Sequence, residues 1–546
     1  MPTPFPNQPD PYQDRNLYAD DAALQEAVQR ESALAFVPTL AAFGQRCGSA
    51  AVLALGDAAN RNPPTLATHD ARGERVDVVE FTPAWHALMQ LGKEAREHSL
   101  PWTDRTPGAQ VARAALMLMH GQVENGTQCP LTMTFAAIPL LMRHANDVPD
   151  FAAVWLPRLL APLHDPESKP IDAKRGALIG MGMTERQGGS DVRSNRTRAE
   201  ARGDGSFAIT GHKWFFSAPQ SDAHLVLAQD DGGPSCFFLP RLLPDGSRNA
   251  VRINRLKDKL GNRSNASAEV EFDGAIAWRV GPAQQGIATI LEMVRLTRLD
   301  CVLGSTGIMR AALACALHHA SRRVVFGQVL TEQPLMANVL ADLALEVEAA
   351  TALAMRLAHA FEAAEDTSEH ALARLVTPAA KFWICKRGPA LAAEAMEVLG
   401  GNGYVETSML PRLYRELPVN SIWEGSGNIM CLDVLRTMAR EPQAVGALRA
   451  ELALARGSHP AFDAAVAAFE SGLADGATPA DARRVAQAIA TLLQAALLLR
   501  HAPPAVGDAF VASRLAPAPY GGAVFGSLPA TIDHRLIMTR ALPSAA

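Results

Sequence analysis

The sequence is poor in aromatic residues and has no excess of positive charge, and both shortages exclude classes of protein. Phe, Trp and Tyr make up 6% of the 546 residues, whereas many segments are rich in Ala and Leu, which favours a largely helical protein. The 51 basic and 56 acidic residues give a formal net charge of −5, so the chain as a whole has no electrostatic attraction to nucleic acid. No run of about 18 uncharged apolar residues is present, and we therefore expect no membrane partner.

Cysteine is scarce, and its spacing is irregular. The seven cysteines form no C-x-x-C motif and stand mostly in apolar surroundings. An odd, scattered set argues against a zinc site or a disulfide framework and predicts reduced, buried thiols in a cytoplasmic protein without a bound metal. The N-terminal segment 1–11 lacks a basic start and an apolar core, so we predict an extended arm and no signal peptide. The cysteines are Cys47, Cys129, Cys236, Cys301, Cys315, Cys385 and Cys431.

The chain is too long for a single hydrophobic core, and its periodicity divides it into helical and β segments. Apolar residues recur every three or four positions over most of the chain, which predicts a mainly α protein. Between Gly176 and Gly281, short alternating runs separated by Asp-Gly turns predict an inserted antiparallel β-domain of roughly 100 residues. The predicted segments are an extended arm (1–19), an N-terminal helical domain (20–178), a middle β-domain (179–284), a helical bundle (285–440) and a C-terminal helical domain (441–546).

A single carboxylate, Glu424, stands between Trp423 and a Gly-Ser-Gly turn. An apolar helical pattern begins directly afterwards, and Ser426 or Asn428 can cap that helix. Two interpretations follow from these residues alone. Either Glu424 complements the positive end of a helix dipole, or it is a general base that a neighbouring apolar wall desolvates, which would raise its pKa.

Two segments of the predicted β-domain suit a ring-shaped ligand. In segment 180–191, glycines would let the backbone approach a ligand, and Thr184 and Ser190 offer hydroxyl groups to a polar ring edge. A dinucleotide-binding βαβ unit is not indicated, because no later acidic partner follows the glycines. Segment 211–217 brings three consecutive aromatic residues and Ser217 to the end of a strand, where they form either a stacking wall or part of the core.

A third pair of segments suits a pyrophosphate. Arg323 precedes Phe326-Gly327, and far along the chain Gly400-Gly401-Asn402-Gly403 follows a helical pattern. A guanidinium and a glycine turn can both bind phosphate oxygens. A basic helix end and a glycine C-cap explain the same residues separately, so both interpretations remain open.

These segments resemble the acyl-CoA dehydrogenase family in their residues and in their order along the chain. The resemblance implies that family's fold: an N-terminal helical domain, a middle antiparallel β-barrel and a C-terminal four-helix bundle. Here an extra C-terminal helical domain follows. The matching segments are 181–191 (first flavin loop), 211–217 (second flavin loop), 323–327 (dinucleotide arm), 400–404 (glycine turn) and 423–426 (catalytic segment).

The resemblance also implies FAD bound without a covalent link, with Glu424 as the base that removes the α-proton of an acyl-CoA thioester. Some relatives carry the base on another helix, before an arginine. That place is Thr297 here, so Glu424 is favoured, and Arg298 is expected to contact the substrate. Phe215 occupies the usual Trp position beside the flavin ring, and Pro334 replaces a Gln of the family's adenine contact. The implied cofactor contacts are Met181, Met183, Thr184, Gly189, Ser190, Phe215, Phe216, Ser217, Arg323, Phe326, Gly400, Gly401, Gly403, Ile422, Trp423, Gly425, Ser426 and Asn428.

Within the family, the chain resembles the adaptive-response (AidB-like) branch over nearly its whole length. That resemblance implies binding of double-stranded DNA, a role in the response to alkylation damage and at most weak acyl-CoA dehydrogenation; a genuine acyl-CoA dehydrogenase is the alternative. It also implies a homo-oligomer, expected to be a tetramer, in which a neighbouring subunit supplies the Arg323 arm. The residues themselves support DNA binding only mildly. The basic run from Arg252 to Arg263 partly matches a structural turn of the family. From Glu441 to the end, 8 arginines are balanced by 8 acidic residues, Glu441 included. Arg436, in the last turns of the helix after Glu424, is either a DNA contact or a complement to the helix dipole.

Overall fold

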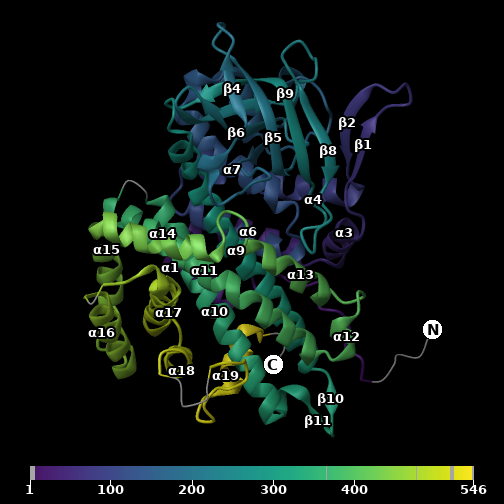
Figure 1. Cartoon of the computed structure of the whole chain (residues 1–546). Helices are drawn as coiled ribbons and strands as arrows, with labels where there is room; N and C mark the ends of the chain where they lie inside the picture. The colour runs from purple at the N-terminus through teal and green to yellow at the C-terminus, as the bar shows by residue number, and fades with distance from the viewer. Residues whose placement is uncertain (1–6, 364–365, 475, 517–521, 544–546) are drawn as a thin grey trace, which may run out of the picture. The chain divides into compact units, whose positions relative to one another are not determined.

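The computed structural model describes residues 7–363, 366–474, 476–516 and 522–543 (Figure 1). The chain forms two compact units, each assembled from separate stretches of sequence. The predicted β-domain folds together with helices of the predicted N-terminal domain. The predicted bundle folds together with the N-terminal arm and the C-terminal helices. Unit 1 comprises Met1–Leu53, Thr106–Val123 and Arg298–Ala546, and unit 2 comprises Ala54–Arg105 and Glu124–Thr297.

Unit 2 is built on a seven-stranded sheet with the strand order β3-β5-β4-β6-β7-β9-β8. A further pairing between β5 and β9 closes a ring of strands, which confirms the expected barrel. Most neighbours are antiparallel, but β3 runs parallel to β6, and β4 meets β6 at one parallel pair. The strands are β3 (Ile179–Gly182), β4 (Arg198–Ala201), β5 (Phe207–Ser217), β6 (Ala223–Asp230), β7 (Gly233–Pro240), β8 (Val251–Leu256) and β9 (Ser267–Val280).

Alternate residues of the strands form the barrel core, as the period of two requires. Ile209 on β5, Val226 on β6, Phe237 on β7 and Val270 on β9 are all buried in one cluster. Helices complete unit 2: α4 (Pro83–Glu94), α5 (Leu100–Thr103), α7 (Gln128–Arg143) and α8 (Leu156–Leu160).

One part of the N-terminal region is not helical, contrary to our prediction. Residues 65–80 form an antiparallel hairpin of β1 (Thr65–His69) and β2 (Arg75–Glu80), which lies beside β8 in Figure 1. Its second strand, Arg-Val-Asp-Val-Val-Glu, alternates polar and β-branched residues, and the Asp70–Gly73 turn precedes it. The alternating patterns of these two strands are too short to be recognised between long helical segments.

Unit 1 is a helical bundle around α9 (Gly286–Ala320), α10 (Pro334–Glu362) and α11 (Thr367–Val398). The helix before the glycine turn, α11, begins at Thr367 and continues through Pro378 and Pro389. The helices are α1 (Ala22–Arg30), α2 (Val37–Cys47), α6 (Ala109–Val123), α10 (Pro334–Glu362), α11 (Thr367–Val398), α12 (Gly401–Tyr404), α13 (Leu410–Asn420), α14 (Gly427–Arg440), α15 (Pro442–Ala453), α16 (Pro460–Ala474), α17 (Ala482–His501), α18 (Pro504–Arg514) and α19 (His534–Ala541). Two helices, α3 (Ala50–Arg61) and α9 (Gly286–Ala320), run through the boundary between the units.

Arginines tie the C-terminal helices to the bundle. Arg514 on α18 lies 3.0 Å from Glu346 on α10, and Arg540 on α19 lies 2.9 Å from Glu348 on the same helix. Arg500 on α17 pairs with Glu451 on α15 at 3.2 Å. The arginines of this region therefore serve mainly as internal partners of carboxylates.

Among the residues that the structure describes, two helices are long and apolar enough to cross a bilayer by length and composition, α9 and the segment Pro479–His501. Their most apolar windows are 100% and 72% buried inside the structure, as in the core helices of a bundle. Six of the seven cysteines are buried, and Cys315 is half-buried, which agrees with the predicted environment of the thiols.

Candidate functional site

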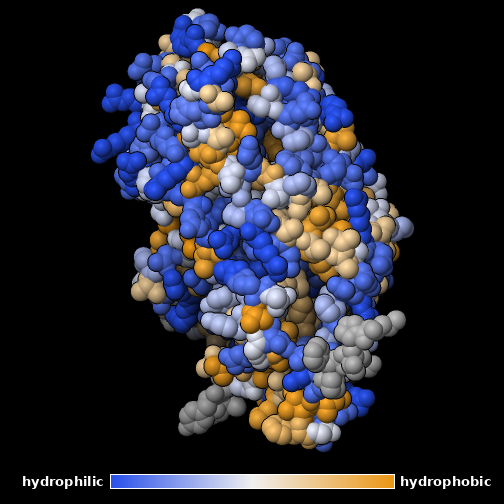
Figure 2. Space-filling model, turned by 90° about the vertical axis from the view of Figure 1, so that its right-hand side faces the viewer, coloured by the Kyte–Doolittle hydropathy of each residue, from blue (hydrophilic) through white to orange (hydrophobic). Residues whose placement is uncertain are grey.

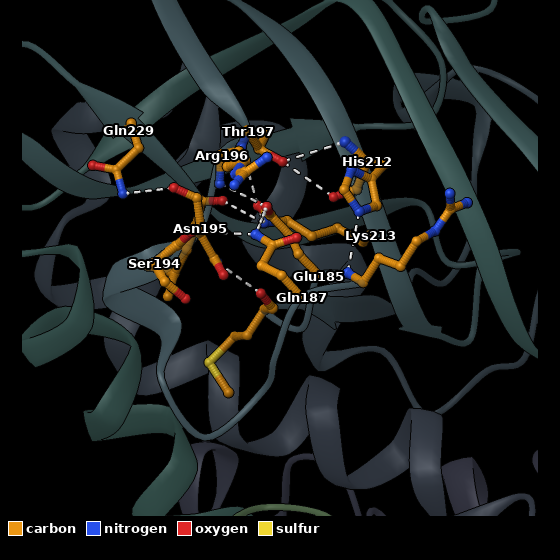
Figure 3. Close-up of polar contacts among 12 residues, drawn as sticks. Glu185, Gln187, Ser194, Asn195, Arg196, Thr197, His212, Lys213 and Gln229 are labelled. Atoms are coloured by element: carbon orange, nitrogen blue, oxygen red, sulfur yellow. Dashed lines mark hydrogen bonds and ion pairs between the residues drawn. The ribbon is translucent and has the colours of Figure 1, made fainter.

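A buried ion pair anchors the first predicted flavin loop. Glu185 lies 2.8 Å from Lys213 of β5, and neither side chain is exposed (Figure 3). The backbone amide of Arg196 donates to Glu185 at 2.6 Å, and Lys213 also donates to the Leu227 carbonyl at 2.7 Å. Burial acts to raise the pKa of Glu185, but Lys213 and the Arg196 amide lower it to about 2. Burial lowers the pKa of Lys213 to about 8, against the opposing effect of Glu185.

Amide side chains hold the rest of this loop in place. Asn195 Nδ2 donates to the Met183 carbonyl at 2.9 Å, and Gln229 Nε2 donates to the Asn195 carbonyl at the same distance (Figure 3). The predicted contacts Gly189 and Ser190 are exposed at the open end of the loop, and Thr184 and Met183 are half-buried. The loop is thus fixed at its base and accessible at its tip.

Gly180 and Gly182 allow rings to pack closely and do not open the backbone to a ligand, contrary to our prediction. A Cβ atom at Gly182 would lie 2.5 Å from Phe216 Cδ2, and one at Gly180 would lie 2.3 Å from His224 Cδ2. The two rings stack with centroids 4.1 Å apart. Phe216 is 1% exposed and belongs to the barrel core, so only its backbone remains for the predicted cofactor contact. Met181, on the same strand as the glycines, is buried too.

The second predicted loop presents one open aromatic face. Phe215 is 50% exposed, and Lys257 Nζ lies 4.8 Å from its ring centroid and 3.5 Å from that of Trp214. Ser217 is half-buried at the end of β5, where it pairs with Met181. Of the three aromatic residues, Phe215 is therefore the one whose side chain can stack on a flat ring.

Glu424 has a backbone conformation that non-glycine residues rarely adopt, with φ at +58°. Three hydrogen bonds fix the backbone around it. Arg298 Nε donates to the Glu424 carbonyl at 3.0 Å, Lys381 Nζ donates to the Gly425 carbonyl at 2.9 Å, and Trp423 Nε1 donates to Asn420 Oδ1 at 2.9 Å. Such conformations cost about 1–3 kcal/mol and persist where surrounding contacts impose them.

Arg298 holds the predicted catalytic loop. Its positive charge is neutralised within the protein, without a substrate. Its Nη1 donates to Asp433 Oδ2 of α14 at 2.8 Å, and Arg374 pairs with the other oxygen of Asp433 at 3.0 Å. Burial acts to raise the pKa of Asp433, but the two arginines lower it. The predicted contact of Arg298 with substrate stays a prediction.

Sequence reasoning missed Lys381, Asp433 and Arg374. Asp433 interrupts the apolar pattern of the helix after Glu424. A single acidic residue on a buried, apolar helix face requires a basic partner. Lys381 lies at the middle of α11 and Arg374 about two turns before it, without a local motif. Only the fold brings them to the catalytic segment.

Ser426 occupies the N-cap position of α14, but its side chain makes no capping hydrogen bond there. Asn428 Oδ1 accepts a hydrogen bond from Arg483 Nε of α17 at 2.9 Å, so neither predicted cap satisfies the helix end. Amide groups of a first helical turn that lack a cap can bind an anionic or polar ligand. Ile422, which precedes this turn, is exposed.

The predicted dinucleotide arm is a hairpin of β10 (Val324–Val325) and β11 (Gln328–Val329), with Phe326 at its tip. Phe326 is 94% exposed and has φ at +53°. The N-terminal arm connects this hairpin to the glycine turn: Asn7 Nδ2 donates to the Val324 carbonyl at 2.7 Å, and Asn402 Nδ2 donates to Gln8 Oε1 at 3.0 Å. Arg323 Nη1 donates to the Asn7 carbonyl. The structure therefore brings the hairpin and the glycine turn to the same side of unit 1, whose lower end in Figure 2 is hydrophobic.

The glycines of the turn have different roles. Gly400 has φ at +61° and ψ at −141°, a combination that only glycine adopts easily. A Cβ atom at Gly403 would lie 2.3 Å from the Met396 carbonyl oxygen, so Gly403 is needed for packing. A Cβ atom at Gly400 or Gly401 would meet no described atom within 4 Å, which leaves the backbone of these two residues open to a ligand.

Three family models match segments of the chain. "Adaptive response protein AidB N-terminal domain" matches residues 7–166, "Acyl-CoA dehydrogenase, middle domain" matches residues 180–275, and "Acyl-CoA dehydrogenase, C-terminal domain" matches residues 284–439. Together they include both flavin loops, the hairpin, the glycine turn and Glu424.

Similar proteins match over most of the chain. AidB of Escherichia coli (strain K12) is 53% identical over 507 residues, which cover 92% of this chain and 93% of that protein. Acyl-CoA dehydrogenase family member 11 of Caenorhabditis elegans is 31% identical, covering 89% and 84%. Among solved structures, Caenorhabditis elegans ACDH-11 in complex with C11-CoA has a TM-score of 0.84 and 28% identity, covering 99% of this chain and 93% of that one.

Proposed function

The chain belongs to the acyl-CoA dehydrogenase family, and on that premise we propose that it is an FAD-containing AidB homologue that binds double-stranded DNA and takes part in the response to alkylation damage. Its acyl-CoA dehydrogenase activity is at most weak in this proposal. The observation that supports a working flavin site is the backbone of Glu424, which is held in an unusual conformation by Arg298 and by a lysine that contacts the next residue.

Each unit, taken by itself, contains residues that fit part of FAD, the cofactor of this family. In unit 2, Phe215 offers an exposed ring face, and the tip of the Glu185 loop offers open backbone groups. In unit 1, the first turn of α14 lacks a side-chain cap, and Gly400 and Gly401 leave open backbone. When bound, FAD supplies the acceptor for the hydride that leaves the β-carbon of an acyl-CoA.

In the proposed reaction, Glu424 takes the proton from the α-carbon of the thioester. Because the backbone of residues 423–425 is fixed, the Glu424 side chain starts from a defined position. It therefore loses little conformational freedom when a substrate binds. Loss of the α-proton and the β-hydride leaves the 2-enoyl-CoA. The chain's own contribution is therefore the position of one base.

Anaerobic titration of the purified protein with a panel of acyl-CoAs tests this chemistry. We expect slow or partial bleaching of the flavin in the wild type and none in Glu424→Gln. Glu470→Gln, which removes an exposed carboxylate paired with Arg449, is the matched control and should behave as the wild type. Bleaching that persists in Glu424→Gln would contradict the assigned base. A colourless protein that FAD cannot reconstitute would contradict the cofactor assignment.

A genuine acyl-CoA dehydrogenase with an unassigned, branched short-chain or other acyl substrate is the second candidate. The similarity to ACDH-11, solved with C11-CoA, favours this alternative and adds a longer acyl chain to the panel. Complete and rapid bleaching by one acyl-CoA would support it over a weak or vestigial activity.

The DNA-binding part of the proposal rests on the similarity to AidB, because few basic side chains of the C-terminal region are available. Five of its arginines pair with carboxylates: Arg449, Arg484, Arg500, Arg514 and Arg540. Arg456, Arg535 and the nearby Arg436 are exposed. Arg436 lies 3.6 Å from Asp433, too far for a strong ion pair.

Retention of a DNA duplex on the protein should weaken steeply as salt rises, because contacts with phosphate release counterions. Arg436→Gln combined with Arg456→Gln should reduce the slope by about 2 in the logarithmic plot. A duplex that shows no shift even at low salt would contradict DNA binding and leave the flavin chemistry unaffected.

We also propose that the protein is a cytoplasmic homotetramer. The exposed side chains of Phe326, Leu335 and Tyr404 suit an interface with a second copy better than they suit water. The buried thiols suit a reducing compartment. Light scattering measures the mass in solution, and cell fractionation tests the compartment.

A further inference from the structure

A hollow in unit 2 lies behind the second predicted flavin loop and has no role in the proposed function. It is enclosed by the ends of β5, β6 and β7, by β8 and by the hairpin strand β2, which lies beside β8 in Figure 1. Its empty volume, including the open mouth, is about 390 Å³. Most of this volume is open to solvent, and the enclosed part has room for little more than one water-sized group, so a ligand has to be small and to extend into the open mouth. The polar residues that line it are Asp77, His224, Arg241, Arg248 and Asn249.

The carboxylates around this hollow are already paired. Asp77, whose side chain is 1% exposed, accepts from Arg75 Nε and from Arg248 Nη2, both at 2.9 Å. Asp222, the acidic residue whose charge acts on Arg241, lies 3.0 Å from Lys174. Basic residues therefore outnumber acidic residues around the hollow, which leaves an excess of positive charge.

Arg241 carries this excess. Its Nη1 donates to Ser168 Oγ at 3.0 Å, but within the described part of the chain its buried Nε has no hydrogen-bond partner. Burial lowers the pKa of Arg241; Asp222 opposes this effect, and the neighbouring charge of Arg248 adds to it. A buried guanidinium nitrogen without an acceptor is costly, and an anion in the hollow would remove that cost.

The remaining walls make the hollow a place where charge interactions are strong. Leu239, Val251 and Ile253 line it with apolar surface, and the Phe216 and His224 rings stack against each other at its inner side. His224 is neutral near pH 7, because burial lowers its pKa to about 3. Apolar walls reduce the local dielectric constant and so strengthen attraction between a guanidinium and an anion.

We propose that this hollow is a binding site for a small oxyanion, a carboxylate or a phosphate group, held by Arg241 and Arg248. Asp77 has φ at +44°, and this strained conformation keeps its carboxylate between Arg75 and Arg248, so that Arg248 is held at the hollow. Phe216 separates the site from Phe215 and Ser217, its neighbours on β5. The hollow shares Phe216 with the second predicted flavin loop, but Phe215 and Ser217 do not line it.

Isothermal titration of the full-length protein with inorganic phosphate, acetate and chloride tests the proposal. We expect phosphate, acetate or both to bind, and the affinity to fall at least tenfold in Arg241→Gln. Arg252→Gln is the matched control, because Arg252 lies on the same sheet, is exposed and pairs with Asp273, away from the hollow. Phosphate binding alone identifies a phosphate ester as the ligand class, and acetate binding alone identifies a carboxylate.

A second pair of variants tests the site without relying on the loss of an arginine. Val251→Glu places a carboxylate inside the hollow, and Val251→Gln places a neutral side chain of the same shape there. Val251→Glu should melt at a higher temperature than Val251→Gln and should no longer bind the added oxyanion. The proposal is overturned by wild-type protein that binds neither oxyanion, by chloride that binds as tightly as they do, by unchanged affinity in Arg241→Gln, or by unchanged affinity in Val251→Glu. None of these results depends on flavin content.

Discussion

Replacement of Gly182 by alanine distinguishes a packing glycine from a ligand-binding glycine. The new Cβ atom would lie 2.5 and 2.6 Å from two carbons of the Phe216 ring, about 1 Å closer than ordinary contact. That ring is buried and stacked on His224, so it has no free direction in which to move. Overpacking of this kind costs about 1–3 kcal/mol. For a folding unit of this size, the melting temperature should fall by about 3–10 °C.

Calorimetry of the flavin-loaded and flavin-free protein measures this effect in both forms. We expect Gly182→Ala to lose stability equally in the two forms. Gly188→Ala, in the loop that follows, is the control, because a Cβ atom there would meet no described atom within 4 Å. It should change the melting temperature by less than 1 °C. This corresponds to about 0.3 kcal/mol. A Gly182→Ala protein with normal stability but weakened flavin binding would refute the packing argument and restore the original prediction for this glycine.

Three other predictions follow from the described contacts. Asp433→Asn should lower the free energy of unfolding by about 3 kcal/mol in a urea titration, because it leaves Arg298 and Arg374 without their shared carboxylate. Burial lowers the pKa of Lys93 to about 7, so the unfolded chain binds more protons than the folded one between pH 7 and the ordinary lysine pKa. Wild-type stability should therefore rise with pH in this window relative to Lys93→Met, by about 1.4 kcal/mol per pH unit at most; a constant difference across pH would contradict the lowered pKa. Phe326→Ser should shift the oligomer toward smaller species in light scattering, whereas Val78→Ser, another exposed apolar position, should not.

The family, the barrel and the order of the site segments were predictable because each depends on local residues. Phe215 and Phe216 show where local reasoning stops. Both are apolar neighbours in one motif, but a register shift of β5 against β9 between Lys213 and Phe216 turns one ring outward and the other into the core. A motif cannot report such a shift, because it depends on the partner strand.

The surroundings of Glu424 illustrate a second limit. Its place between an aromatic residue and a glycine turn is visible in the sequence, and so is the helix that follows. The groups that fix its backbone come from α9 and α11, which are more than 40 residues away in the chain. The contact of Arg298 with a substrate stays a prediction, but its pairing with Asp433 was not foreseen, although a buried guanidinium requires an acceptor within the protein.

The ion pairs between the C-terminal helices and α10 have a consequence for any attempt to shorten the chain. Asp342, Glu346 and Glu348 are buried, and each is neutralised at least in part by Arg514 or Arg540. A fragment that ends at Glu441 would retain the three acids and lose these two cations, so negative charges would remain in an apolar interior. Removal of the last hundred residues would therefore damage the bundle itself. Glu346 would keep its pair with Arg387, so a stable shortened protein would need neutral residues above all at Asp342 and Glu348. The extra segment is therefore an integral part of the bundle.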